Sequence, residues 1–492
     1  MSSLGAPPTE FLSIGRNLAR LAAEKPTAPA LTVAEHTLTF GELHARSNRM
    51  ARGLKQQGVK LGDFVTIALP NSLDFIVAEF ACWKLGATPQ PVSWRLPAHE
   101  INAIIALANA PLVIGDSTTL KAERPVVSPD ALVALSSDAS DLPDAIALSW
   151  KAPTSGGSTG RPKLIVAGNP GVVARGASEG ALWRYSGSDT VLMTGPLYHN
   201  APFGLSATAL HTGAHVVLMV KFDAEETLRL IERHRATWLY LVPTMMSRIW
   251  RLPNREQYDV SSLKTIWHMA APCPPWLKEE WIRWVGGETL LELYGGTEGQ
   301  TITIIDGNEW LAHKGSVGKP LALGEMKAFS ADGKMLGPGE TGEIYLRRDP
   351  SLPPSYRYVG AEARTLPGGW ESLGDIGWFD AEGYLYLADR RTDMILVGGA
   401  NVYPAEIEAA LDEHPLVASS AVIGLPHDEL GNQIHAIVQP RPGLDLDDLR
   451  QHLAARLVSY KQPRTFELVT ENVRDDAGKV RRTALRDERM KK

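Results

Sequence analysis

Phosphate-binding chemistry is indicated first by the stretch that ends at Lys163. It reads Thr154, Ser155, Gly156, Gly157, Ser158, Thr159, Gly160, Arg161, Pro162 and Lys163. Glycines let backbone N–H groups turn toward an anion, hydroxyls add donors, and the lysine supplies a positive charge. A P-loop differs, because its lysine directly follows a glycine and opens a helix. The flanks at 145–150 and 164–168 predict two strands joined by a phosphate-binding loop; a Gly/Ser-rich surface linker is the alternative.

Other polar or glycine-rich turns follow predicted strands. Pro243-Thr244 comes after WLYLV, Ala271-Pro272 after TIWHM, and Gly295-Gly296-Thr297-Glu298 after LLELY. In parallel α/β sheets, ligands bind at the carboxyl ends of the strands. We therefore expect these turns to share one crevice, although each alone is compatible with an ordinary connection.

Alternating strand and helix patterns supply the sheet that would carry these turns. A strand at 65–69, a helix through Phe80 with Asn71 and Ser72 as candidate caps, and a strand at 88–92 predict a βαβ unit. The pattern returns with helices at 224–234 and 276–284, each followed by a strand, at 237–242 and 289–293. Near the start, one helical face is predicted from Phe11, Ile14, Leu18 and Leu21, and a capping box from Thr39 and Glu42. The expected fold class is α/β with mostly parallel sheets.

The last hundred residues have a different pattern, which predicts a small α+β unit. It contains a strand at 394–397, a helix opened by Pro404, strands near Ala421 and Ala436, and a helix with one apolar face at Leu446, Leu449, Leu453 and Leu457. We expect a large N-terminal domain over residues 1–390 and a small C-terminal domain over 391–492. The basic residues 481–492 are expected to form a solvated end.

Composition limits the classes of function. The 492 residues include 50 Lys plus Arg against 56 Asp plus Glu, a net charge of −6, which gives no electrostatic case for binding nucleic acid. Only two cysteines occur, Cys82 and Cys273, as is typical of a reduced intracellular compartment. No basic leader precedes an apolar core, and no apolar run reaches ~18 residues. We expect a soluble cytoplasmic protein without an integral membrane segment.

Five motifs in order resemble those of the adenylate-forming superfamily, which contains acyl-CoA synthetases, peptide-synthetase adenylation domains and firefly luciferase. They are TSGGSTGRPK, YGGTEG, the GDIGWFD run at 374–380, ADRRTDMILVGGANVYPAEIE and the final AGKVRR. The resemblance spans nearly the whole chain. It implies a large N-terminal adenylate-forming domain and a small mobile C-terminal domain that acts as a lid. It also implies two steps: a carboxylate and MgATP give an acyl-adenylate and pyrophosphate, and a thiol then takes the acyl group.

The resemblance also implies roles for single residues in nucleotide binding. The loop from Thr154 to Lys163 would hold the β- and γ-phosphates, and Glu298 would bind Mg²⁺, a hard cation that prefers carboxylate oxygen. Tyr294 would offer a flat face to adenine, in a pocket with Ala271, Pro272, Gly295, Gly296 and Thr297. Asp375 would accept hydrogen bonds from ribose hydroxyls and Arg390 would donate to them, whereas taken singly either residue is compatible with a surface charge.

For catalysis, the resemblance gives the central role to Lys479. Its ammonium group would meet the α-phosphate and the substrate carboxylate and offset their charge in the transition state. Rotation of the lid would replace Lys479 by a face with Gly398 and Gly399, whose missing side chains leave room for a pantetheine arm. His199, in PLYHNAPF, matches a position between the acyl pocket and the thiol tunnel, with a hydrogen-bonded core histidine as the alternative.

Three positions depart from the superfamily pattern. Thr392 stands at the hinge in place of Asp or Lys, Met269 where many relatives have glycine before the Ala-Pro pair, and Leu373 where they have threonine before Gly-Asp. We expect Met269 to narrow the acyl pocket and Leu373 to remove a hydroxyl near the α-phosphate. Trp238, Tyr240, Met245 and Trp267 are candidates for an apolar pocket or for the core.

The motifs favour an AMP-forming acid–thiol ligase that uses ATP, Mg²⁺ and coenzyme A. In wording they are most similar to those of bacterial ligases for fatty, bile-acid-like or steroid side-chain acids. The chain ends soon after Lys479 with no appended carrier domain, so we expect a free acceptor, either coenzyme A or a separate carrier protein. Luciferase-like oxidation and a non-catalytic nucleotide-binding relative are further alternatives. The oligomeric state stays open, with a homodimer as one expectation.

Overall fold

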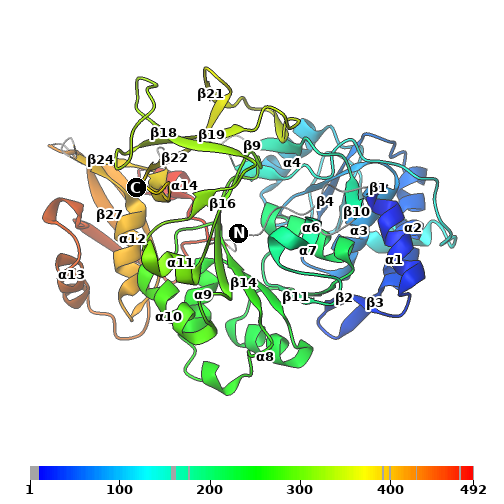
Figure 1. Ribbon diagram of the computed structural model, residues 1–492, viewed down its shortest axis with the longest axis horizontal. Coiled ribbons are helices and arrows are strands. Elements are labelled where there is room, and N and C mark those ends of the chain that lie inside the picture. The colour runs from blue at the N-terminus through cyan, green and yellow to red at the C-terminus, as the bar shows by residue number, and fades with distance from the viewer. Residues whose placement is uncertain are drawn as a thin grey trace.

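A nine-stranded sheet forms the centre of the N-terminal body in the computed structural model (Figure 1), which describes residues 10–156, 162–175, 178–390, 393–397, 400–427, 429–475 and 478–490. Its strands lie in the spatial order β17 (Lys319–Pro320), β16 (Thr303–Asp306), β15 (Leu290–Tyr294), β14 (Thr265–His268), β13 (Trp238–Leu241), β11 (Thr190–Met193), β12 (His215–Leu218), β2 (Pro29–Val33) and β3 (His36–Thr39). All pairs from β15 to β2 are parallel. The expected α/β architecture is confirmed.

Helices connect these strands and begin and end at residues that suit helix termini. They are α6 (Ser178–Trp183), α7 (Asn200–Thr212), α8 (Ala224–His234), α9 (Pro243–Trp250), α10 (Pro275–Val285) and α11 (Gly307–Ala312). The Asp223 carboxylate caps α8 by accepting from the Glu226 N–H, and Gly213 ends α7 in the left-handed conformation. Pro243 opens α9, so the predicted Pro243-Thr244 turn is instead the first turn of a helix.

A second sheet lies beside the first and contains the predicted βαβ unit. Its strands, all parallel, are β5 (Thr88–Pro91), β4 (Phe64–Ala68), β6 (Val113–Gly115) and β7 (Val126–Val127). The helices of this half are α1 (Ile14–Glu24), α2 (Phe40–Gln56), α3 (Leu73–Lys84), α4 (Ala98–Ala108) and α5 (Pro129–Ala134). Both hydrogen bonds of the capping box between Thr39 and Glu42 are present, and Ser72 caps α3. One expectation was wrong: Phe11 belongs to a strand and is 61% exposed, so it does not share a face with Ile14.

Smaller antiparallel sheets complete the body. The phosphate-binding motif lies between β8 (Thr154–Gly156) and β9 (Pro162–Ala167), which pair with β20 (Tyr356–Val359). The strand before the loop therefore starts at Thr154, and the expected strand at 145–150 is irregular chain. β1 (Glu10–Ser13) pairs with β10 (Val172–Arg175). Beyond residue 320, a further sheet contains β18 (Gly324–Phe329), β19 (Gly342–Arg348), β22 (Trp370–Phe379), β21 (Arg364–Leu366) and β23 (Leu385–Arg390).

The described residues from 393 onward form an α+β unit, which we call the lid. Its strands are β24 (Ile395–Val397), β25 (Ala400–Val402), β26 (Val417–His427), β27 (Gly431–Pro440) and β28 (Thr465–Leu468), and its helices are α12 (Pro404–Glu413), α13 (Leu446–Ala454) and α14 (Arg482–Met490). The lid has its own apolar core, separate from that of the body. The predicted boundary at 390/391 adjoins residues outside the described part and stays a prediction. The basic end is helical, because α14 packs on β26 and Arg482 pairs with Glu408.

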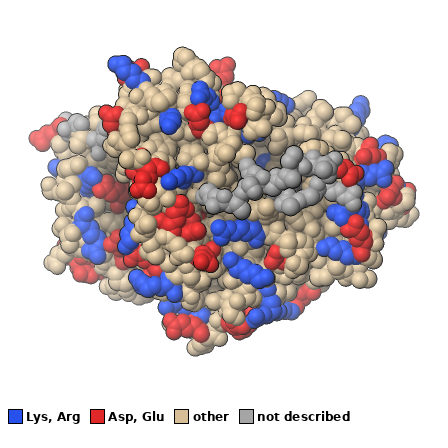
Figure 2. All heavy atoms as spheres, in the orientation of Figure 1, with Lys and Arg blue, Asp and Glu red and all other residues tan. Residues whose placement is uncertain are grey.

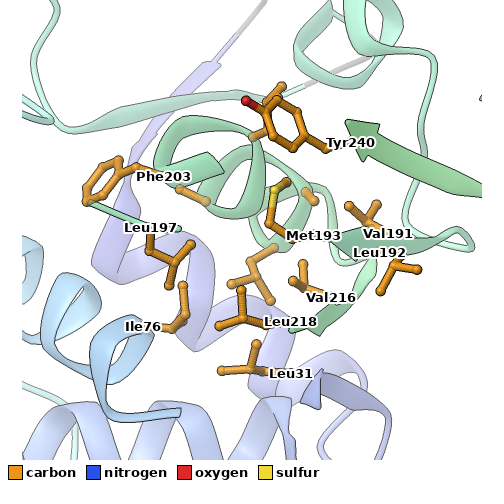
Figure 3. Close-up of a cluster of buried hydrophobic side chains, with 14 of the residues drawn as sticks. Leu31, Ile76, Val191, Leu192, Met193, Leu197, Phe203, Val216, Leu218 and Tyr240 are labelled. Atoms are coloured by element: carbon orange, nitrogen blue, oxygen red, sulfur yellow. The ribbon is translucent and has the colours of Figure 1, made fainter. Parts of the chain in front are cut away.

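Core packing explains why the large sheet is rigid enough to carry a site. Figure 3 shows side chains of β2, β11 and β12 packed between the helices, with Ile76 of α3 and Leu197, just before α7, on the side of the strands, while the ring of Phe203 points away from them. The central strands are buried on both faces, as expected for parallel sheets covered by helices. The visible surface mixes acidic and basic side chains (Figure 2). Among the helices of the described residues, none combines the length and apolarity needed to cross a bilayer.

Two buried histidines should make the body sensitive to acid. Burial lowers the pKa of His211 to about 3 and that of His268 to about 4, so both rings stay neutral in the folded state. In the unfolded chain a histidine takes up a proton near pH 6.5. The free energy of unfolding should therefore fall below about pH 6.5, by up to about 1.4 kcal/mol per pH unit for each histidine, until the folded pKa is reached.

Thermal unfolding between pH 8 and pH 5 tests this prediction. The His211→Phe variant keeps an aromatic ring against Phe80 and Trp83 but has no ring nitrogen to protonate. Its melting temperature should therefore fall less steeply with acid than that of the wild type. Parallel curves for the two proteins would show that His211 is not responsible.

Candidate active site

Three neighbouring parallel strands end at the same edge of the large sheet. β13, β14 and β15 are in register through Tyr240 opposite Trp267 and Trp267 opposite Leu291. Thr244 therefore follows one strand end, Ala271-Pro272 the next, and the segment from Tyr294 to Glu298 the third. The predicted convergence of these segments is confirmed, and it places the adenine candidates side by side along one edge.

An acidic and a basic candidate meet beside this edge. Nζ of Lys163 lies 3.6 Å from Oε1 of Glu298, and the Glu298 side chain is only 8% exposed. The hydroxyl of Tyr358 donates to the same Oε1 at 2.6 Å, and Nζ of Lys163 lies 3.8 Å from the centre of the Tyr358 ring. Partial burial, and then the negative charge of Glu298, raise the pKa of Tyr358 and keep its proton in place as a donor. The three residues form one cluster, which we call the Glu298 cluster.

The geometry of two antiparallel strands brings Lys163 and Tyr358 together. β9 carries Lys163 and pairs with β20, in which Tyr358 stands opposite Ile165. Tyr356 lies two residues earlier on the same face of β20, and its hydroxyl donates to Oε2 of Glu371 at 2.5 Å. Gln300 donates to the same oxygen at 2.7 Å. Neither tyrosine was recognised from the sequence as a site residue, although the alternation in SYRYVG is a signal for one strand face.

The adenine and ribose candidates are linked by a hydrogen bond. The Tyr294 hydroxyl donates to Oδ2 of Asp375 at 2.7 Å, and Asp375 is 8% exposed. In the sheet, Asp375 on β22 stands opposite Arg390 on β23. The backbone thus brings together the three residues expected to bind the nucleoside. The side chain of Arg390 lies outside the described atoms.

Two glycines let the backbone approach its neighbours closely after β15. A β-carbon added at Gly296 would lie 2.5 Å from Leu373 and 2.6 Å from Oε2 of Glu298. One added at Gly295 would lie 2.6 Å from Ile302. Leu373, one of the departures from the superfamily pattern, therefore packs into space that the absent side chain of Gly296 leaves open.

The segment after β14 contains backbone strain. Ala270 has φ of 76°, in the left-handed region that glycine enters without steric cost. The backbone strain thus lies at Ala270, whereas Met269, named above as a departure from the superfamily pattern, has a buried side chain at 5% exposure. A strained residue directly before Ala271-Pro272 fixes the course of the backbone where the adenine pocket is expected.

Several predicted residues lie outside the described part of the chain. These are Gly157, Ser158, Thr159 and Gly160 in the loop, Thr392 at the hinge, and Gly398 and Gly399. Of Ser155 and Gly156, the structure describes the backbone. Thr154 is described, and its hydroxyl accepts from Nε2 of Gln90 at 3.0 Å, while Thr66 donates to the other end of the same amide at 2.7 Å. The start of the loop is thus anchored to the second sheet.

The turn that carries Lys479 lies against the body. Main-chain hydrogen bonds of 2.9 Å join Asp475 to Gly478 and to Lys479 and close the turn. Gly478 has φ of 74°, and a β-carbon there would lie 2.9 Å from Oγ1 of Thr244. The Lys479 turn therefore lies at the carboxyl end of β13, next to the strands that carry the other candidates. Lys479 itself is exposed.

Other candidates have positions that fit the core as well as a pocket. His199 precedes α7 as its N-cap residue, and its ring lies 4.6 Å from that of Tyr198. The side chains of Trp238, Tyr240, Met245 and Trp267 are all buried. The indole N–H groups of Trp238 and Trp267 both donate to the carbonyl of Trp183, at 2.7 and 3.1 Å, so these two rings are core residues.

The family models agree with this arrangement. The model described as "AMP-binding enzyme" matches residues 18–356, and the one described as "AMP-binding enzyme C-terminal domain" matches residues 406–479. The first match contains Lys163, Tyr294 and Glu298, and the second contains most of the lid and ends at Lys479. Tyr358, Asp375 and Arg390 lie between the two matched ranges.

Curated relatives are similar over nearly the full length. The chain is 31% identical to a feruloyl-CoA synthase from an Amycolatopsis species, over 95% of this chain and 97% of that enzyme. It is 31% identical to an indoleacetate–CoA ligase from Aromatoleum aromaticum, over 95% and 96%. It is also 31% identical to a fatty acid–[acyl-carrier-protein] ligase from Streptomyces coeruleorubidus, over 95% and 94%.

A solved structure agrees as well. The o-succinylbenzoate CoA synthetase of Bacillus subtilis, in complex with its acyl-adenylate, superposes with a TM-score of 0.83 at 28% identity, over 97% of this chain and 99% of that one. The same enzyme in complex with ATP and a magnesium ion gives a TM-score of 0.81. With the family models, the relatives and the strand-end site in agreement, the chain belongs to the AMP-binding enzyme family, whose members include acyl-CoA and aryl-CoA ligases.

Proposed function

We propose that this protein activates an apolar carboxylic acid with MgATP to an acyl-adenylate and then transfers the acyl group to coenzyme A. In the first step a carboxylate oxygen attacks the α-phosphorus and pyrophosphate leaves; in the second a thiol sulfur attacks the acyl carbon and AMP leaves. The observation that carries the proposal is the position of the Lys479 turn. It lies at the same sheet edge as Tyr294, Asp375 and the Glu298 cluster.

The Glu298 cluster suits a magnesium-bound triphosphate. The buried Glu298 carboxylate offers oxygen, and Lys163 would face the phosphates as a positive charge. Magnesium is commonly bound by one or two carboxylates together with substrate phosphates and water. Within the described ranges, no group of three or more His, Cys, Asp and Glu side chains forms a metal site. A single carboxylate that shares the ion with the nucleotide fits this arrangement.

Lys479 would act between the two negatively charged reactants, where electrostatic repulsion is strongest. The acid and the triphosphate are both anions, and their approach is opposed unless a cation lies between them. A lysine from the lid that enters this space would stabilise the pentavalent transition state. Tyr294 would cover one face of adenine, while Asp375 and Arg390 would bind the ribose hydroxyls. His199, at the start of α7, remains a candidate for the path of the thiol.

Support for the acid and the acceptor comes from the relatives. Those with the same degree of identity act, by name, on ferulate, indoleacetate and fatty acid. Another, from Rhodococcus jostii and 29% identical, is a CoA ligase for a bicyclic indenyl propanoate, which is compatible with the fatty or steroid side-chain acids suggested by the motifs. By name, most of these relatives transfer the acyl group to coenzyme A, whereas the fatty-acid ligase transfers it to a carrier protein. Both acceptors are therefore tested.

AMP formation from a panel of acids tests the proposed function. The panel contains long-chain fatty acids, hydroxycinnamates, arylacetates and steroid side-chain acids, each with ATP and Mg²⁺, with and without coenzyme A. At least one acid should give acyl-CoA and AMP in equal amounts when the thiol is present. If turnover occurs only with an acyl carrier protein, the carrier protein and not coenzyme A is the acceptor. If no acid leads to conversion of ATP, the proposed function is contradicted.

Lys479→Ala should separate the half-reactions. Loss of the ammonium group should slow acid-dependent pyrophosphate release by at least about 10²–10³-fold, because its charge is needed only in adenylation. Thioester formation from supplied acyl-adenylate should stay within about twofold of wild type. Lys334→Ala, which removes an exposed lysine on the body, is the matched control. Equal losses in both half-reactions would refute the role of Lys479.

Tyr358→Phe should raise the magnesium concentration that the protein requires. The variant keeps the ring under Lys163 but loses the hydrogen bond to Glu298. A hydrogen bond to a buried charge contributes enough for about a tenfold effect. We expect the magnesium concentration for half-maximal pyrophosphate release to rise by about that factor. Tyr356→Phe is the comparison variant: its hydroxyl donates to Glu371 and its ring contacts Tyr358 but not Glu298, so the rise should be clearly smaller. The same shift in both variants would point to general disturbance of β20.

A further inference from the structure

Helix α9 contacts the lid at both of its ends. At its first turn, Thr244 touches Gly478 in the turn that carries Lys479. Just after its last residue, Arg251 donates from Nη2 to the carbonyl of Asp412 at 2.6 Å and from Nη1 to the carbonyl of Val417. The step of seven positions from Thr244 to Arg251 corresponds to about 10 Å along a helix axis. Figure 1 shows α9 and α10 beside α12.

The chemistry of the Arg251 contact suits a reversible interaction between the body and the lid. The carbonyl of Asp412 belongs to the last turn of α12, where carbonyls lack a helical partner and carry partial negative charge. A guanidinium group presents its donors in a fixed fork, so the two carbonyls fix direction as well as distance. Within the described residues, an ion pair of 3.8 Å also joins Arg481 of the lid to Glu100 of the body, but these side chains are partly exposed to solvent and the pair contributes little.

A chain of contacts leads from Arg251 to Lys479 inside the lid. The Asp412 carboxylate accepts from Ser420 at 2.7 Å and lies 3.6 Å from Nη2 of Arg474. Arg474 also pairs with the buried Glu408 at 3.0 Å and donates to the Gly478 carbonyl at 3.3 Å. Gly478 directly precedes Lys479. The residue that Arg251 holds is therefore connected, through one arginine, to the turn that carries the lysine.

We propose that α9 is the seat of the lid in the adenylate-forming orientation, and that Arg251 is a positioning residue which acts on Lys479 through Asp412 and Arg474. The inference rests on the proposed function. The seat holds the lid at two points on one rigid helix, so the Lys479 turn cannot shift along the sheet edge while both contacts are made. Thioester formation, which needs another lid orientation, does not use the seat.

Arg251→Met tests the proposal because it keeps most of the apolar stem and removes the fork. We expect kcat for acid-dependent pyrophosphate release to fall about 10- to 100-fold, the range for lost charge-assisted hydrogen bonds, with little change in KM for ATP. Thioester formation from supplied acyl-adenylate should change by less than about twofold or become faster. Arg251→Lys should recover part of the loss. Arg248→Met is the matched control, since Arg248 is exposed on the same helix and stacks on Phe222 of the body.

A double variant shows whether Arg251 acts through Lys479. In the Lys479→Ala background, Arg251→Met should cause little further loss of pyrophosphate release, because the group being positioned is already absent. Fully additive losses, equal losses in both half-reactions, or an unchanged first half-reaction would each overturn the proposal. Failure of the wild type to convert ATP with any acid would instead overturn the proposed function, so the two failures are distinguishable.

Discussion

Two anions have to meet in this site, and the arrangement of charge follows from that constraint. In water a carboxylate and a triphosphate repel each other only weakly, but at a partly buried sheet edge the same repulsion is several times stronger. The body meets this constraint with Lys163, which already lies beside the buried carboxylate of Glu298 and the ring of Tyr358. In the proposed mechanism the lid adds Lys479, which lies more than 300 residues further along the chain. In the proposed mechanism, charge compensation would thus be divided between the two units, and rotation of the lid would withdraw only the part that Lys479 supplies.

The parallel sheet makes this division possible. Strands β13, β14 and β15 are buried, so their ends are fixed by packing and their following segments are free to carry function. Tyr294 and Asp375 come from different sheets, yet a 2.7 Å hydrogen bond joins them. Glycines such as Gly296 let Leu373 and Glu298 approach the main chain. The site is precise because its parts rest on rigid elements rather than on a single long loop.

Much of this could be predicted from the sequence, for a physical reason. The capping box at Thr39 and the alternation of helices and strands along the chain depend on neighbouring residues, and they agreed with the structure. Motifs with polar residues at strand ends predicted the convergence at the sheet edge. What failed depended on distant partners. Phe11 looks helical until β10 supplies a strand to pair with. The basic end has no buried residue in α14, as expected for a solvated end, but its position depends on Glu408 and Asp393, which bind Arg482. Tyr358 was missed because its partners, Lys163 and Glu298, are both more than 50 residues away in sequence.

The same reasoning applies to Arg251, which no motif marks. An arginine at the end of a short amphipathic helix is usually a solvated charge, and its sequence neighbours give no sign of a partner. Its function in the structure depends on a carbonyl of Asp412, 161 residues away, and a main-chain carbonyl offers no side-chain signature to detect. Hydrogen bonds to carbonyls also suit an interaction that must break when the lid rotates, because water can replace them without leaving a buried charge unpaired. A salt bridge buried at the same place would hold the lid more tightly but would resist the rotation on which the second half-reaction depends. Hydrogen bonds from the Arg251 guanidinium to main-chain carbonyls thus position Lys479 accurately and still allow the lid to rotate in each catalytic cycle.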